Sequence, residues 1–429
     1  MSTKQNRRSF LTKAGVGAAA LASTPLIQTF GNGLDEAKEK TSMMSAPADL
    51  RITAVKCAYT NAGGMFVKLE TNQGITAWGE SVDASVGSYY LLKRMAGQLT
   101  RSQNPLRPNA IFESIRKGGV FGGAQAGTFV ATLTALETAL WDLTGKALGL
   151  PIHQLLGGKQ RDKIRVYCDT EFYSGGGKTP ENFAKAAQNV LDRGYTCVKF
   201  DLDEAGDPNK FDRVNWTASL REIERMENCV AAARKQVGNK LEICCDMHGR
   251  YDAVSGRAAA KALEPYKLMW LEEPIPADNP EIYKTITSET STPICCGENV
   301  YLTYGFSRLL SETMVDIIMP DLQKCGGLGE GQRIANMAAT YYTPFSPHMV
   351  GTMVGAMASA HVCASVPNFQ IMEWQTKTDT DAMWKEMVIY DKPFIEKGYM
   401  VVSDKPGIGV DVNEEGMKKY ATRGVPYFE

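Results

Sequence analysis

Residues 241–246 read LEICCD, a run of strand-forming residues that ends at Asp246 in a polar loop. The same pattern recurs in LMWLE, which ends at Glu272, and in PICCGE, which ends at Glu298. The three acids are spaced 26 residues apart, a length that fits one strand and one helix. Because equal strand-helix units return the chain to the same end of a parallel barrel, the three carboxylates are predicted to converge there.

Three converging carboxylates predict a metal site. An all-oxygen shell completed by water and substrate oxygens suits Mg²⁺ better than a metal that prefers thiolate or imidazole ligands. Taken singly, each acid could instead be a solvated loop residue or a helix cap, so the prediction depends on the common spacing. We therefore expect Asp246, Glu272 and Glu298 to bind Mg²⁺ together.

The size and charge of the chain favour an enzyme that acts on a small molecule. Its 429 residues are enough for a barrel and a second module. With 47 basic and 48 acidic residues the formal net charge is −1, and no basic stripe is interleaved with aromatic residues. This pattern does not favour binding to nucleic acid.

The first thirty residues predict an export signal. Arg7 and Arg8 form a twin-arginine pair, which is followed by a weakly hydrophobic run rich in alanine and glycine. Residues 14–26 are too short to span a bilayer and contain two glycines and a proline, so a membrane anchor fits poorly. The alternative is a short amphipathic helix. We expect residues 1–30 to direct export to the periplasm by the Tat route, and residues 31–49 to form a polar tether.

The ten cysteines are expected to be structural. Cys244-Cys245 and Cys295-Cys296 are adjacent pairs inside apolar, strand-like runs. Neighbours on a strand point to opposite faces, and cysteine in such a run usually serves as a small buried hydrophobe. The spacing of the cysteines is also unlike that of a small disulfide scaffold or a zinc site. No functional role is therefore assigned to them.

Residues 50–160 are predicted to form an α+β capping domain. Strand-forming runs at 51–59, 65–71 and 75–80 indicate an antiparallel meander. Leucines at three- and four-residue steps predict a long helix over residues 128–148. Helices therefore follow three strands in this part of the chain.

Residues 161–375 are predicted to form a TIM-like (β/α)₈ barrel, because strands and helices alternate throughout this range. The fold class is therefore α/β, with a tail at residues 376–429 that completes the capping domain. The helix after the last strand is not clear from the pattern. The eight predicted strands span residues 164–169, 197–202, 241–246, 268–272, 293–298, 317–321, 343–348 and 369–374.

Seven short motifs follow these strands in order. They are VKFD (198–201), CDMHGR (245–250), WLEEP (270–274), CGEN (296–299), MPDLQKCGG (319–327), SPH (346–348) and MEW (372–374). Together they resemble the enolase superfamily, and more narrowly its mandelate racemase subgroup. The pair Asp246 and His248, with Glu373, is similar to the galactonate dehydratase branch. The resemblance covers nearly everything after residue 50 and implies the barrel and capping domain described above.

The resemblance implies a reaction that begins with removal of the proton next to a substrate carboxylate. That proton is weakly acidic, and the resulting enediolate needs a strong positive charge beside it, which bound Mg²⁺ would supply. His348 is the candidate base, because the ordinary pKa of histidine suits this task at neutral pH. Asp321 is expected to bond the other ring nitrogen and fix its orientation. Alternatively, His348 is a packed histidine and Asp321 is a cap.

The next step of the reaction depends on the face opposite His348. In racemases of this subgroup a Lys-x-Lys strand supplies a second base there, but here the strand reads Lys199-Phe200-Asp201. A base on one face favours loss of a hydroxide over reprotonation. His248 is the candidate acid for the leaving hydroxyl, and Glu373 is a further catalytic candidate. Alternatively, His248 only holds a substrate hydroxyl and Glu373 pairs with a structural cation.

The sequence therefore predicts a Mg²⁺-dependent acid-sugar dehydratase, a lyase that would convert an aldonate-like 2,3-dihydroxy acid into a 2-keto-3-deoxy acid. Lys199, Asp201 and Arg250 are the candidate substrate-binding residues. By resemblance, a histidine base implies the 2R configuration and thus a galactonate- or gluconate-like substrate. We also expect a homo-oligomer.

Two alternatives remain open. Asp201 as a second base would permit an epimerase or racemase, and a cycloisomerase is possible on the same site. The other alternative is an exported protein that binds sugar acids without turnover. The acid itself is not identified, because specificity is expected to come from loops that match no known pattern. These loops lie around residues 63, 85–90, 172–177 and 203–217.

Overall fold

The computed structural model describes residues 49–61, 64–99, 104–170, 177–212, 214, 216–375, 382–390 and 393–429. The predicted signal and nearly all of the predicted tether lie outside these residues, as do residue 63 and residues 172–176. Residues 51–429 form one compact unit. Within the described part of the chain, no helix combines the length and the apolar character needed to cross a membrane.

The capping domain begins with the predicted meander. Its strands pair antiparallel in the order β1-β2-β3, and helix α5 packs on β2 and β3. Gly79 permits this contact, because a Cβ at that position would lie 2.0 Å from the carbonyl oxygen of Ala135. The elements are β1 (Ile52–Tyr59), β2 (Gly64–Thr71), β3 (Thr76–Val82), α3 (Ser88–Leu99), α4 (Pro108–Gly118), η1 (Val120–Gly122), α5 (Gly127–Leu148) and α6 (Ile152–Leu155).

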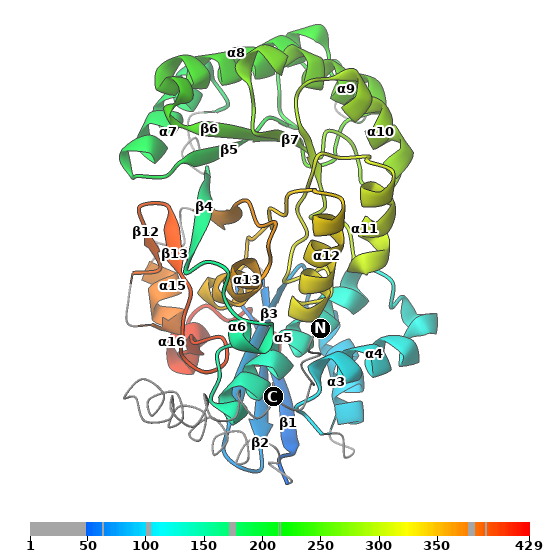
Figure 1. Ribbon diagram of the computed structural model, residues 1–429, viewed down its shortest axis with the longest axis vertical. Helices are drawn as coiled ribbons and strands as arrows, with labels where there is room; N and C mark the ends of the chain where they lie inside the picture. Colours follow the sequence, from blue (N-terminus) through cyan, green and yellow to red (C-terminus); the bar gives the residue numbers. More distant parts are fainter. Residues whose placement is uncertain are drawn as a thin grey trace, which may run out of the picture. The chain divides into compact units, whose positions relative to one another are not determined.

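The barrel strands run parallel in the order β4-β5-β6-β7-β8-β9, and β10 pairs with β4 to bring the two ends of the sheet together. Helices α7 to α11 follow one another around the outside of β5, β6 and β7 (Figure 1). The elements are β4 (Lys163–Asp169), α7 (Pro180–Asp192), β5 (Cys197–Asp201), α8 (Leu220–Val237), β6 (Glu242–Asp246), α9 (Ala253–Ala262), β7 (Trp270–Glu272), α10 (Pro280–Glu289), β8 (Ile294–Cys296), α11 (Leu302–Ser311), β9 (Ile317–Ile318), α12 (Leu328–Thr340), α13 (Met353–Ser365) and β10 (Met372–Gln375).

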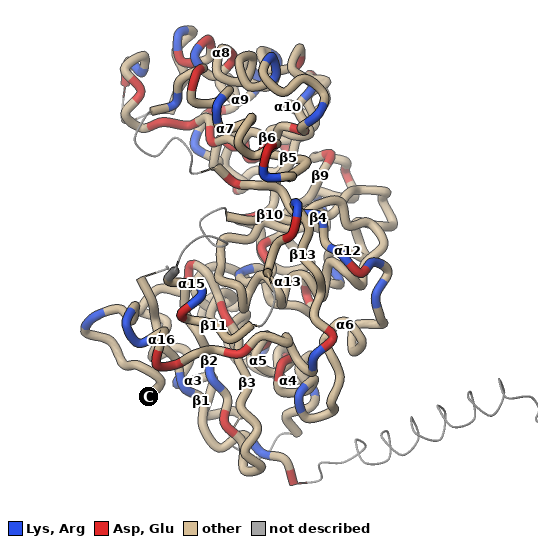
Figure 2. Tube along the Cα trace, turned by 90° about the vertical axis from the view of Figure 1, so that its left-hand side faces the viewer, with Lys and Arg blue, Asp and Glu red and all other residues tan. Residues whose placement is uncertain are grey.

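Helix α8 illustrates why these segments form the outer layer. Ser219 caps its start by accepting a hydrogen bond from the backbone N–H of Glu222. Met226, Cys229 and Val230 recur at helical spacing and are buried. Acidic and basic residues are interspersed along the rest of the helix, as they are along the chain in general (Figure 2). The buried stripe therefore faces the protein interior, where Glu222 pairs with Lys210 at 2.8 Å, and the other charged residues of the helix are partly or fully exposed.

The seventh predicted strand, residues 343–348, is not a regular strand. The ring closes there through isolated parallel bridges from Ile318 to Phe345 and from Phe345 to Phe369. Pro344 and Pro347 explain the difference, because proline has no N–H to donate to a sheet. The segment keeps its place in the barrel but lacks a continuous hydrogen-bond ladder.

The barrel interior contains a layer of inward-pointing side chains below the strand ends. Alternation along each strand separates this layer from the outer core, so Cys244 and Cys295 point inward whereas Cys245 and Cys296 pack toward the helices. All ten cysteines are free and buried, as predicted. The inner layer consists of Tyr167, Cys197, Cys244, Trp270, Cys295, Ile317, Met319 and Ile371.

The C-terminal tail contacts both parts of the unit. Strand β13 pairs antiparallel with β4 of the barrel. On the capping domain, the N–H of Ile408 donates to Asp142 at 2.8 Å, and that of Phe428 donates to the carbonyl of Cys57 at 2.8 Å. The tail thus completes the capping domain, as expected, while the exact domain boundaries stay predictions. Its elements are α15 (Ala382–Met387), β11 (Val388–Ile389), β12 (Ile395–Glu396), β13 (Tyr399–Val401), β14 (Asp411–Val412) and α16 (Glu414–Lys418).

Candidate active site

The polar residues of the site lie one layer above the apolar interior. Because alternate residues of a strand share a face, the residue two positions after an inward apolar side chain also points inward, at the carboxyl end of the strand. The resulting pairs are Cys197 and Lys199, Cys244 and Asp246, Trp270 and Glu272, and Ile371 and Glu373. Strand alternation alone therefore brings one lysine and three carboxylates to the same end of the barrel.

Glu298 reaches the site by a different route. Gly297, which has φ +148°, follows strand β8 and turns the chain. A Cβ at Gly297 would lie 2.9 Å from the ring of Phe306 and 3.0 Å from the backbone of Met319, so only glycine fits without strain. Asn299 then holds Glu298 through a 3.0 Å hydrogen bond and holds Glu273 through one of 2.9 Å.

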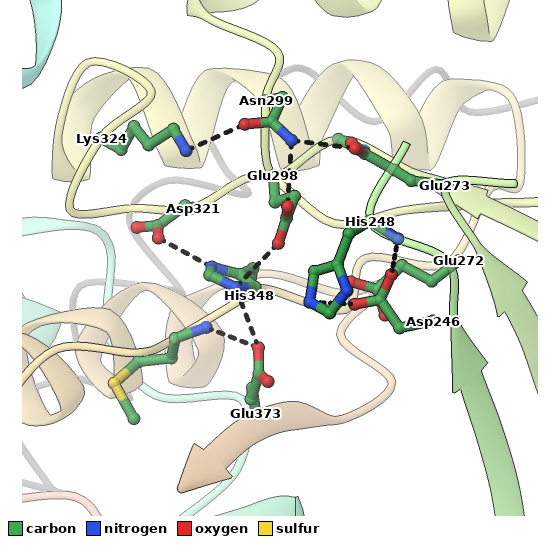
Figure 3. Close-up of polar contacts among 12 residues, drawn as sticks. Asp246, His248, Glu272, Glu273, Glu298, Asn299, Asp321, Lys324, His348 and Glu373 are labelled. Carbon is green, nitrogen blue, oxygen red and sulfur yellow. Dashed lines mark hydrogen bonds and ion pairs between the residues drawn. The ribbon is translucent and has the colours of Figure 1, made fainter. Parts of the chain in front are cut away.

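Asp246, Glu272 and Glu298 form a cluster that fits a hard divalent cation. Each offers a carboxylate oxygen, and these atoms lie within 4.8 Å of one another (Figure 3). Burial, reinforced by the charge of Asp246, raises the pKa of Glu272 well above its ordinary value. The cluster therefore needs a compensating positive charge, and its all-oxygen donor set suits Mg²⁺. Asp201, Asp246 and His248 form a second group of possible metal ligands, which shares Asp246 with the first.

Lys199 supplies part of that positive charge. Its ammonium lies 2.9 Å from Glu373, 3.3 Å from Asp246 and 3.4 Å from Glu272, and the residue is only 2% exposed. Burial lowers the pKa of Lys199, but the carboxylates of Glu272 and Glu373 outweigh it and hold the pKa well above the usual value. The lysine thus forms ion pairs with carboxylates of the site. Its contact with the substrate stays a prediction.

His348 and Asp321 form the predicted hydrogen-bonded pair. Nδ1 of His348 lies 2.8 Å from Oδ2 of Asp321 (Figure 3). Nε2 lies 2.8 Å from Glu298 and 3.5 Å from Glu373, so this nitrogen faces the cluster. Burial lowers the pKa of His348, but Glu373, Glu298 and Asp321 outweigh it and raise the pKa well above its ordinary value. Asp321 itself is held by the N–H of Gln323 at 2.7 Å.

A second histidine–aspartate pair lies beside the first metal-ligand candidate. His248 does not continue the strand, because its φ of 48° is left-handed. Its Nε2 nevertheless comes within 3.6 Å of Asp246, while Nδ1 lies 2.7 Å from Oδ1 of Asp203. Burial lowers the pKa of His248, but Asp203 and Asp246 outweigh it and raise the pKa to about 9. The turn, rather than strand alternation, therefore places this imidazole.

Asp203 is a site residue that the sequence analysis did not select. It appeared there only as the start of a polar insertion after the second barrel strand. Its second carboxylate oxygen contacts Nε of Arg250 at 2.9 Å. Arg250 in turn stacks over Trp216 at 5.2 Å, which anchors the end of the insertion beside the site. The role of Arg250 in substrate binding stays a prediction.

Glu373 and Asp201 occupy different surroundings. Glu373 is fully buried and accepts a hydrogen bond from the N–H of Met349 at 3.1 Å. Burial raises its pKa, but Lys199 and His348 outweigh this effect and lower it, so the carboxylate is ionised. Asp201 is partly buried at the edge of the cluster, and burial raises its pKa. Glu373 is therefore part of the central network, whereas Asp201 lies at its periphery.

Comparison with known protein families identifies this arrangement. The mandelate racemase / muconate lactonizing enzyme N-terminal domain matches residues 38–157, and the enolase C-terminal domain-like family matches residues 182–416. The chain belongs to the enolase superfamily, within its mandelate racemase subgroup, as the motifs predicted. The protein is thus an enzyme with a barrel and a capping domain of this superfamily.

Individual relatives include two dehydratases, which are lyases. D-xylonate dehydratase of Haloferax volcanii is 33% identical over 384 residues, covering 89% of this chain and 91% of that protein. D-galactonate dehydratase of Pectobacterium atrosepticum is 30% identical over 379 residues, covering 85% and 93%.

Solved structures show the same fold. A mandelate racemase/muconate lactonizing enzyme-like protein from Rubrobacter xylanophilus has a TM-score of 0.84 at 37% identity, covering 89% of this chain and all of that one. A member of the enolase superfamily from Salmonella Typhimurium has a TM-score of 0.79 at 28% identity, covering 87% and 98%.

Proposed function

We propose that the protein is a Mg²⁺-dependent acid-sugar dehydratase, which converts an aldonate-like acid into a 2-keto-3-deoxy acid. The observation that carries the proposal is the pairing of two histidines with aspartates around three carboxylates. His348 with Asp321 contacts Glu298, and His248 with Asp203 contacts Asp246. One nitrogen of each histidine is fixed by its aspartate, which directs the other nitrogen toward the metal-ligand candidates, where the substrate would bind.

Asp246, Glu272 and Glu298 would hold the metal ion. Bound Mg²⁺ would supply the positive charge that the substrate needs when the proton next to its carboxylate leaves. His348 removes this proton through Nε2, and Asp321 stabilises the imidazolium that results. Glu373, ionised and 3.5 Å from the same nitrogen, and Glu298 favour the protonated ring and raise the pKa of His348. An ion held by Glu298 would offset this negative charge and leave the ring neutral, which is the form that can accept the proton.

His248 then completes the elimination. Its raised pKa keeps the ring protonated at neutral pH, which is the state required to donate a proton to the departing 3-hydroxyl. The hydroxyl and the proton leave together as water, and the enol that remains becomes the 2-keto acid. The acid and the base are thus two separate histidines with separate aspartate partners.

The surroundings of Lys199 support elimination over racemisation. A lysine base requires a lowered pKa, whereas the pKa of Lys199 is raised by the carboxylates around it. The position two residues further on, where racemases of the subgroup have a lysine, is Asp201. A strong base on the face opposite His348 is therefore not expected.

A screen of aldonates with the purified protein and Mg²⁺ tests the proposal. Formation of a 2-keto-3-deoxy acid from galactonate, gluconate or xylonate is the expected result, and His348→Asn should abolish it. The same reactions in D₂O separate a dehydratase from an epimerase. An epimerase would give recovered substrate that carries deuterium and an inverted configuration at C2, and it would give no keto acid. Tight binding of an acid without any product would instead indicate a binding protein.

Export to the periplasm is also part of the proposal. It is supported by the twin-arginine pair Arg7 and Arg8, which lies outside the described residues. Cell fractionation of the wild type and of a variant with both arginines replaced by lysine tests it. Equal amounts of both proteins in the periplasm would contradict a Tat signal.

A further inference from the structure

A large cavity adjoins the carboxylate cluster and is not explained by the reaction itself. It has a volume of about 680 Å³ and begins at His248 and Asn299. One wall comes from α4 and the segment that precedes α5, and the others come from the loops that follow β6, β7 and β8 and from helix α11. Its polar and aromatic lining includes Arg116, Gln125, Asp278, Asn299, Tyr301 and Tyr304.

The volume exceeds what a simple aldonate requires. Cavities of roughly 300–1,000 Å³ hold drug-sized molecules, which are larger than a five- or six-carbon acid. The carboxylate end and the reacting carbons of the substrate would lie against the two histidines and the metal-ligand candidates, and of these residues only His248 lines the cavity. The cavity beyond His248 is therefore available for a further part of the molecule.

The charges of the lining favour an uncharged occupant. His248 is already paired with Asp203 at 2.7 Å, and Asp278 adds an exposed negative charge to the lining. Arg116 is also already paired with Glu113 at 3.1 Å. A phosphate or a second carboxylate would need an excess of positive charge that this lining does not provide.

The aromatic and polar groups match those that bind a sugar ring. Tyr304 is 74% exposed, and the guanidinium of Arg116 lies 5.6 Å from its ring centre. Such rings pack against the C–H faces of a sugar, while the amide of Gln125 and the exposed carboxylate of Asp278 can bond its hydroxyls. The cavity thus combines a stacking surface with hydrogen-bonding groups at its edge.

The position of His248 connects this cavity to the reaction. In the proposed function His248 protonates the 3-hydroxyl, so the carbons beyond C3 extend from this residue. Because His248 also lines the cavity, a group attached to those carbons would have room to extend into it.

We propose that the cavity binds a glycosyl unit carried by the far end of the acid, so that the substrates include aldobionic acids. This inference rests on the proposed function. The sugar would be linked to the 4-, 5- or 6-oxygen of the aldonate. The C2–H and C3–O bonds break and water leaves, while the glycosidic bond stays intact. The product is a glycosylated 2-keto-3-deoxy acid.

Steady-state kinetics with matched substrates test the inference. Gluconate is compared with 4-O-galactosylgluconate and 6-O-galactosylgluconate, in the full-length protein with Mg²⁺. We expect kcat/KM to be at least about tenfold higher for one of the glycosylated acids. Tyr304→Ala should lower kcat/KM for that acid about tenfold more than for gluconate. Tyr342→Ala, which alters a tyrosine that is 95% exposed outside the cavity, serves as the control and should change neither value.

Each other outcome has a distinct meaning. Turnover of gluconate without any advantage for the glycosylated acids, or equal effects of the two tyrosine variants, would overturn the inference but not the proposed function. If Tyr304→Ala dissociates a homo-oligomer and leaves the ratio unchanged, the cavity is a subunit contact and the inference also fails.

Absence of product from every acid would contradict the proposed function alone. In that case isothermal titration calorimetry measures how tightly the His348→Asn variant with Mg²⁺ binds gluconate and the glycosylated acids. About tenfold tighter binding of a glycosylated acid than of gluconate, lost in the double variant with Tyr304→Ala, would support the cavity as a glycosyl site. Equal binding of the two acids would refute it.

Discussion

Asp203 and His248 are joined at 2.7 Å, although 45 residues separate them in the sequence. Asp203 follows the end of β5, and His248 lies in the turn after the neighbouring strand β6. The bond leaves Nε2 of His248 facing Asp246 at 3.6 Å. Two adjacent strands therefore cooperate to place one imidazole beside the metal-ligand candidates.

Replacing Asp203 by asparagine should impair His248 without removing it. We expect kcat to fall about 10- to 100-fold while KM changes less, because the ring loses its fixed orientation. Since Asp203 raises the pKa of His248, its loss should also move the alkaline limb of the kcat profile to lower pH. Asp212→Asn alters an exposed carboxylate in the same insertion and should have no effect. A wild-type pH profile in the Asp203 variant would refute the positioning role.

Addition of Mg²⁺ should raise the melting temperature by several degrees, because an ion that binds only the folded state stabilises it by mass action. Glu272→Gln should abolish this shift, since it removes one of three converging carboxylates. Glu312→Gln, which alters a half-exposed surface residue, should retain the full shift. Differential scanning calorimetry with and without Mg²⁺ measures both. A shift that survives in Glu272→Gln would place the ion elsewhere.

Gly297→Ala should weaken both the fold and the metal site. An alanine at φ +148°, with its Cβ 2.9 Å from Phe306, costs on the order of 1–3 kcal/mol. The strain would also displace Glu298, so the affinity for Mg²⁺ should fall. Gly97→Ala is the matched control, because a Cβ there meets no atom within 4 Å. Urea denaturation and Mg²⁺ titration give the two readouts, and equal behaviour of the two variants would contradict the argument.

His361 should make stability depend on pH below neutrality. It is fully buried, with Nδ1 3.2 Å from the N–H of His153 and Nε2 3.0 Å from the carbonyl of Ile408. Burial lowers its pKa to about 3, whereas the unfolded chain takes up the proton near the ordinary value of 6.5. The neutral ring therefore contributes stability that is complete above pH 6.5 and is lost as the pH falls toward 3.

Urea denaturation at pH 7.5 and pH 5 measures this effect. The free energy of unfolding should decrease by about 2 kcal/mol more in the wild type than in His361→Gln, which cannot take up the proton. Subtracting the variant removes the contribution of the other titrating groups. An equal decrease in both proteins would show that His361 does not control the pH dependence.

The barrel was predictable because its signals are local. The alternation of strands and helices predicted the barrel, and the strand-forming runs placed Asp246 and Glu272 at strand ends. The break around Phe345 was not predicted, although Pro344 and Pro347 lack the N–H groups that a continuous ladder would use.

The rest of the site depends on contacts between distant segments. The bond from Asp203 to His248 has no local signature, because it joins loops after two different strands. Lys199 was predicted to bind the substrate, and its ion pairs with carboxylates from three other strands could not be predicted from the local sequence. The turn at Gly297 likewise follows from packing against Phe306 rather than from strand periodicity.

His348 lies on residues 343–348, the barrel segment that lacks a continuous hydrogen-bond ladder. Isolated bridges at Phe345, together with hydrogen bonds from Ser346 to Ile318 and from Glu373 to Pro347, hold this segment in place. Its amides should therefore exchange with deuterated solvent sooner than those of β6, which pairs along its length on both sides. The base thus lies on a segment held by isolated bridges, whereas Asp246 and Glu272 lie on strands with continuous pairing.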